Sequence, residues 1–208
     1  MARPPASGFA RALVVSVALA TILAGCGGGS AGKRLSDAQL GALVLQSSDL
    51  PPAFQQFDEG RQIGADAHSG PRRDPQRFGR QDGWKARYRR SGSATTSGPL
   101  VIESRVDVFG DEGGAKNDLA AYGEELTASA QSAGGGAVDD ALEIGDGSRT
   151  LNLLQGPAGS GVRYITIAWR RGRFTASVSL NGFDRGLTVA DAVRLARRQD
   201  AHLAAAAG

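Results

Sequence analysis

Cysteine is almost absent from this chain of 208 residues, which contains a single one, Cys26. One cysteine allows no disulfide within the chain, so the fold has to be stabilised by an apolar core. Histidine is nearly as scarce, since only His68 and His202 are present, and there is no HExxH or CxxC motif. The sequence therefore predicts no catalytic residue, no metal ligand and no cofactor site.

Lysine is also rare, and arginine supplies most of the basic residues of a chain with a formal net charge of +3. The charge is segregated along the sequence. Residues 61–90 hold nine basic and three acidic residues, residues 103–146 hold two and eleven, and residues 148–208 hold nine and three. We expect these segments either to pair within the fold or to present a basic face to anionic lipid head groups.

Long hydrophobic runs are missing as well. The apolar stretch from Ala12 to Ile22 is too short to span a bilayer, and no second one follows. Arg3 and Arg11 precede this stretch, and Leu23-Ala24-Gly25-Cys26 follows it. A basic start, a short apolar run and small residues before a cleavage point predict a signal peptide over residues 1–25.

The segment Leu23-Ala24-Gly25-Cys26 matches all four positions of the lipobox, and in this respect the chain resembles bacterial lipoproteins. The resemblance implies that the Cys26 sulfur receives a diacylglycerol and that cleavage before Cys26 frees an amine for further acylation. Two acyl chains give stable attachment, because each buried methylene contributes about 0.8 kcal/mol. We therefore expect a lipid-anchored protein of the cell membrane that faces outside the cytoplasm, a location that excludes nucleic acid as a partner.

Behind the anchor, residues 26–34 are Gly-rich and are expected to form a flexible tether, and residues 35–208 a single extracytoplasmic domain. Ser36 and Gln39 form a capping box for a first helix, which is expected to end near Ser47 to Asp49. Residues 59–82 contain almost no apolar side chains and are expected to form an irregular loop.

Alternating apolar and polar residues predict a hairpin between a strand from Trp84 and a strand from Leu100 to Phe109. A helix over residues 114–131 and a strand region over residues 142–154 follow. The clearest hairpin joins residues 164–171 to residues 173–180. Its expected two-residue turn, Arg171-Gly172, places Trp169 opposite Phe174 and Arg170 opposite Arg173.

A C-terminal helix is expected to begin at Thr188, which caps it together with Asp191. The pattern favours an α+β fold: an antiparallel sheet of about five strands with N-terminal, middle and C-terminal helices packed on it. This element order, together with the anchor, resembles the PsbP-like fold, which small lipoproteins of some bacteria adopt.

Two groups of side chains are candidates for function. Arg170, Arg171 and Arg173 crowd the tip of the last hairpin, where they either lie exposed and screened or contact an acidic partner. Five aromatic residues either form plain core or line a hydrophobic cavity between sheet and helices; they are Trp84, Tyr88, Tyr164, Trp169 and Phe174.

The sequence favours a non-catalytic binding domain for a small apolar or lipid ligand. The alternative is an accessory protein-interaction subunit of an envelope transporter, wall enzyme or signalling receptor, docking through the arginine-rich hairpin. A third hypothesis is an envelope hydrolase that uses His68 or His202.

Overall fold

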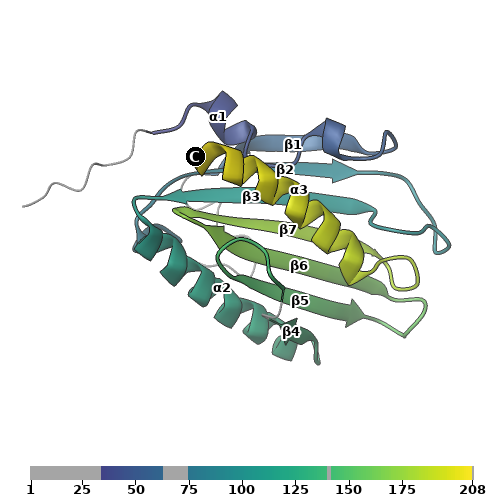
Figure 1. Ribbon diagram of the computed structural model, residues 1–208. Helices are drawn as coiled ribbons and strands as arrows, with labels where there is room; N and C mark the ends of the chain where they lie inside the picture. Colours follow the sequence, from purple (N-terminus) through teal and green to yellow (C-terminus); the bar gives the residue numbers. More distant parts are fainter. Residues whose placement is uncertain (1–33, 63–74, 140–141, 208) are drawn as a thin grey trace, which may run out of the picture. The chain divides into compact units, whose positions relative to one another are not determined.

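A single antiparallel sheet of seven strands organises the described residues of the computed structural model, which are 34–62, 75–139 and 142–207 (Figure 1). The spatial order of the strands is β1-β2-β3-β7-β6-β5-β4, and neighbouring strands are antiparallel throughout. The strands are β1 (Gln55–Arg61), β2 (Arg80–Arg89), β3 (Val101–Phe109), β4 (Ala137–Asp139), β5 (Ser148–Gln155), β6 (Val162–Arg171) and β7 (Phe174–Phe183).

The helical segments are α1 (Asp37–Gly41), the 3-10 helices η1 (Ser47–Asp49) and η3 (Pro75–Phe78), α2 (Glu112–Ser132) and α3 (Val189–Ala207). Two of them, α1 and α3, begin at the caps that the sequence predicts. Ser36 and Gln39 form the expected capping box of α1. At α3, the Thr188 backbone N–H donates to Asp191 at 3.0 Å and the Asp191 N–H donates to the Thr188 hydroxyl at 3.4 Å. Both caps are therefore confirmed.

The sheet buries apolar side chains on both faces. On one face, α1 and α3 contribute Leu40, Ala196 and Leu203 to the larger core, and Figure 1 shows α3 crossing the strands. On the other face, α2 packs against β5 and β6 in a smaller cluster. Trp169 belongs to the larger core and its neighbour Ala168 to the smaller cluster, as expected for successive residues of a strand.

The α+β class and the three helices packed on an antiparallel sheet are confirmed, whereas the expected number of about five strands is wrong. The two strands that the sequence did not predict, β1 and β4, are the edges of the sheet. β1 includes residues 59–61 of the expected irregular loop, and η3 and the start of β2 include residues 75–78 and 80–82; residues 63–74 lie outside the described residues.

The first helix is also shorter than expected: it ends at Gly41 and not near Ser47 to Asp49. Beyond this point a tertiary contact replaces the helical ladder, since the Leu45 backbone N–H donates to the Ser104 hydroxyl at 2.9 Å.

The β6–β7 hairpin turns at Gly172-Arg173, one residue later than expected. Gly172 has a φ of +52°, a left-handed conformation that glycine adopts without strain. The expected placements of Trp169 opposite Phe174 and of Arg170 opposite Arg173 are therefore wrong. The observed pairs are Arg171 with Phe174, Arg170 with Thr175 and Trp169 with Ala176.

The expected signal peptide, the expected lipidation site Cys26 and the expected tether as far as residue 33 lie outside the described residues. Within the part of the chain that is described, no helix is both long and apolar enough to cross a membrane.

Candidate binding site

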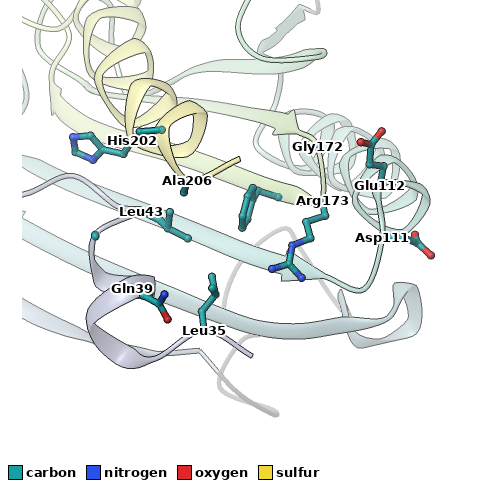
Figure 2. Close-up of a pocket in the computed structure, with 12 residues that line it drawn as sticks. Leu35, Gln39, Leu43, Asp111, Glu112, Gly172, Arg173, His202 and Ala206 are labelled. Carbon is teal, nitrogen blue, oxygen red and sulfur yellow. The ribbon is translucent and has the colours of Figure 1, made fainter. Parts of the chain in front are cut away.

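An open cleft of about 860 Å³ lies between α1, the C-terminal end of α3 and the β6–β7 turn (Figure 2). We call it the α1–α3 cleft. Its volume falls in the range of small-ligand sites, about 300 to 1,000 Å³. Six of its lining residues are apolar: Leu35, Ala42, Leu43, Phe174, Ala205 and Ala206.

A buried hydrogen-bond network fixes the α1 side of this cleft. The chain that follows α1 is held at both polar atoms of the Leu45 backbone, because Tyr88 donates to its carbonyl at 2.6 Å and its N–H donates to Ser104 at 2.9 Å. The Ser104 hydroxyl in turn donates to Gln199 of α3 at 2.8 Å, and Gln199 donates to the Arg105 carbonyl at 2.9 Å. Strands β2 and β3 thus hold α1 and α3 at a fixed separation.

His202 and Arg198 make a second connection between α3 and the chain after α1. The His202 Nδ1 atom lies 3.1 Å from the Val44 carbonyl oxygen, and its Nε2 atom lies 3.6 Å from the Asp49 carboxylate. Arg198 donates to the Asp49 carbonyl. His202 lines the cleft, but its two ring nitrogens lie beside Val44 and Asp49. The other histidine, His68, lies outside the described residues.

Arg173 is the one arginine that lines the cleft. Its guanidinium carbon lies 5.6 Å from the centre of the Phe174 ring, within the range of a cation–π contact. Figure 2 shows the side chain extending into the cleft on the side of Leu35, whereas the carboxylates of Asp111 and Glu112 point away from it.

The three arginines of the hairpin tip do not share one environment. Arg170 lies 3.2 Å from Asp146 and 3.8 Å from Glu112. Arg171 donates to Asp200 at 2.6 Å, and this hydrogen bond raises the pKa of Arg171 above its usual value. The structure therefore engages Arg170 and Arg171 within the fold. A contact of these arginines with an acidic partner stays a prediction.

The five candidate aromatic residues do not line one cavity. Trp84, Tyr88, Trp169 and Phe174 lie on the face that packs against α1 and α3, whereas Tyr164 packs with the α2 cluster on the other face. Only Phe174 lines the α1–α3 cleft. Trp169 and Tyr88 are fully buried, and Trp84 donates to Glu59 at 3.0 Å.

Sequence reasoning missed most of the cleft wall, namely Leu35, Ala42, Leu43 and the alanines of α3. The signal that could have indicated it is the run of alanines over residues 204–207, which leaves space beside the last turns of the helix. Among the described residues, no three His, Cys, Asp or Glu side chains form a group that could hold a metal ion.

No protein-family model matches this chain. No curated protein matches it significantly either. Among solved structures, the fold is similar to the extracellular domain of PknH from Mycobacterium tuberculosis, with a TM-score of 0.47, 10% sequence identity and coverage of 81% of this chain and 98% of that one. We transfer no residue role from that protein.

Proposed function

We propose that this chain is a lipid-anchored extracytoplasmic domain that binds a small apolar ligand in the α1–α3 cleft without acting on it chemically. The lipobox residues Leu23 to Cys26 support the anchor and the location. One observation carries the binding role: a cleft of about 860 Å³ with six apolar lining residues stays open beside a well-packed core.

Two properties of the cleft favour a ligand. Burial of apolar surface contributes about 25 cal/mol per Å², so a small apolar molecule gains free energy from the exposed walls. The walls are also held by the hydrogen bonds of Leu45, Ser104 and Gln199. A site that is already ordered loses less conformational entropy when the ligand binds.

A second candidate function, an accessory protein-interaction subunit of an envelope assembly, is supported by a different observation. Phe57 is the one large apolar side chain that is exposed among the described residues, at 41%. It lies in the edge strand β1, and the guanidinium groups of Arg87 and Arg89 lie 5.3 and 5.2 Å from its ring. Aromatic residues and arginine are enriched at protein interfaces. Cross-linking to a partner in native membranes that is lost on Phe57→Ser would therefore favour this function.

Native mass spectrometry tests the ligand directly. Residues 32–208 are suitable for it, since they form one compact unit that contains the entire described core, from Leu40 to Leu203. We expect the freshly purified protein to retain an adduct of lipid or metabolite size that is absent from its denatured spectrum.

A matched pair of variants places that adduct. Ala206 lines the cleft, whereas Ala204 is exposed on the same helix and does not line it. Ala206→Trp fills the cleft and should lose the adduct, and Ala204→Trp should keep it. A bare mass for the wild type, or an adduct that both variants retain, contradicts a ligand in this cleft.

A further inference from the structure

The charge environment of Arg173 distinguishes it from the other two arginines of the same hairpin tip. Arg170 and Arg171 each have a carboxylate of this chain within 4 Å, those of Asp146 and Asp200. Arg173 contacts the ring of Phe174 and has no acidic partner among the described residues. A guanidinium that lines an apolar cleft and lacks a counter-charge is a binding group for an anion.

The acidic residues nearest to this end of the cleft do not neutralise Arg173. Asp111 is the N-cap of α2, where its carboxylate accepts a hydrogen bond from the Gly114 N–H at 2.7 Å, and the positive end of the helix offsets its charge. The Glu112 side chain is 76% exposed, and its carboxylate lies 3.8 Å from the guanidinium of Arg170. The positive charge of Arg173 is therefore available to a ligand.

We infer that the ligand of the α1–α3 cleft is an anionic amphiphile, whose apolar chain lies between α1 and α3 and whose carboxylate or phosphate head pairs with Arg173. The inference rests on the proposed function, to which it adds the class of ligand. Arg173 is only half-buried, so a head group paired with it can remain in contact with water while the chain is buried. Arginine suits such a head because its planar group donates two parallel hydrogen bonds to carboxylate or phosphate.

Four probes of equal chain length test this inference on residues 32–208. They are octanoate, octyl phosphate, octanol and octyltrimethylammonium, titrated below micelle formation and followed by saturation-transfer NMR. The wild type should bind the two anions about fivefold to tenfold more tightly than octanol, as expected for one charge-assisted contact, and the cation most weakly. Comparison of octanoate with octyl phosphate distinguishes a carboxylate head from a phosphate head.

The variants separate the head group from the cleft. Arg173→Gln should weaken both anions about fivefold to tenfold and leave octanol unchanged, and Arg173→Glu should favour the cation instead. Arg197→Glu changes the charge equally at an exposed site on α3 that does not line the cleft, and it should preserve the preference for anions.

Each failure has a distinct meaning. Three results together would show that the anionic head is wrong while the proposed function stands. Octanol and the anions would bind equally, Arg173→Gln would change no affinity, and Ala206→Trp would abolish binding of all four probes. If no probe binds to the wild type, or if Ala206→Trp leaves binding intact, the proposed function fails and this inference fails with it.

Discussion

Arg171 of β6 and Asp200 of α3 form a two-point ion pair in which Arg171 Nε donates to Asp200 Oδ1 at 2.6 Å and a second guanidinium N–H donates to Oδ2. The same Oδ1 atom accepts a hydrogen bond from the indole N–H of Trp169 at 3.0 Å. Trp169 is fully buried, so this carboxylate satisfies an N–H that has no access to water. Asp200 thereby fixes the half of α3 that borders the cleft.

Removal of this carboxylate should destabilise the domain markedly. We expect Asp200→Ala to lower the free energy of unfolding by about 2 to 3 kcal/mol, because it leaves the Trp169 N–H and a half-buried arginine without an acceptor. Urea unfolding measures the change. Glu124→Ala, at an exposed position of α2, should stay within about 0.5 kcal/mol of the wild type. Equal stability of the two variants would count against the role of Asp200.

The central elements of the fold could be predicted because each contains its own pattern. Strands β2, β3, β6 and β7 alternate apolar and polar residues, and the helix caps at Ser36 and Thr188 are local. The edge strands have no such pattern. β1 is mostly polar and contains a bulge between Gln56 and Asp58, and β4 has three residues, so pairing with a neighbour rather than periodicity defines both.

The candidate site was harder to predict because distant segments form it. Leu35 and Ala206 come from opposite ends of the domain, and only the packing of α1 beside α3 brings them to one cleft. The arginines of the hairpin tip were predictable only in part. Their clustering is visible in the sequence, but which of them forms an ion pair depends on Asp146 and Asp200, which only the tertiary fold brings close.

Gly83 tests how tightly the sheet packs around a buried ion pair. A Cβ atom at Gly83 would lie closer than 3.0 Å to the Asp107 carboxylate and to the guanidinium of Arg80, and these two side chains are at most 2% exposed. We expect Gly83→Ala to destabilise the domain by about 3 kcal/mol, since it separates a buried ion pair. Differential scanning calorimetry measures the loss as a lower Tm.

Gly60→Ala is the control for this substitution. Gly60 lies in the neighbouring strand β1, where an added Cβ atom would meet no atom within 4 Å beyond its own residue and its two chain neighbours. Alanine should therefore be neutral or stabilise the strand by up to about 1 kcal/mol. A Gly83→Ala protein as stable as Gly60→Ala would show that Gly83 is not required for the ion pair.

Tyr88 should make the domain sensitive to alkali. Burial raises the pKa of Tyr88 to about 12. The unfolded chain has a tyrosine pKa of about 10, so the contribution of the neutral phenol is complete below that pH and is lost as the pH rises to about 12. We expect the free energy of unfolding to fall by about 2 to 3 kcal/mol over this window, at about 1.36 kcal/mol per unit.

Tyr88→Phe should remove this alkaline slope while starting from a lower stability. The phenol donates to the Leu45 carbonyl at 2.6 Å, and its loss should cost about 1 kcal/mol near neutral pH. Tyr164→Phe, on the other face of the sheet, leaves Tyr88 in place and should keep the slope. An unchanged slope in Tyr88→Phe would assign the effect to another group.

Asp184 should determine part of the acid sensitivity. The backbone N–H of Gly159 and the guanidinium of Arg163 donate to its carboxylate at 2.6 and 2.8 Å, and these hydrogen bonds hold the pKa of Asp184 below its usual value. Because the folded pKa lies below the unfolded value of about 3.9, the stabilisation is complete above that pH and is lost as the pH falls through the folded value.

Asp184→Asn should therefore flatten the decrease in unfolding free energy below about pH 4, measured by urea titration at a series of pH values. Arg163→Gln should flatten it only in part, because the Gly159 N–H still donates to Asp184. The double variant should match Asp184→Asn, since both substitutions act on one carboxylate. If the two single substitutions instead change the pH dependence of the unfolding free energy additively, Arg163 lowers the pKa of some other acid. The Arg163–Asp184 pair is then not the source of the acid sensitivity.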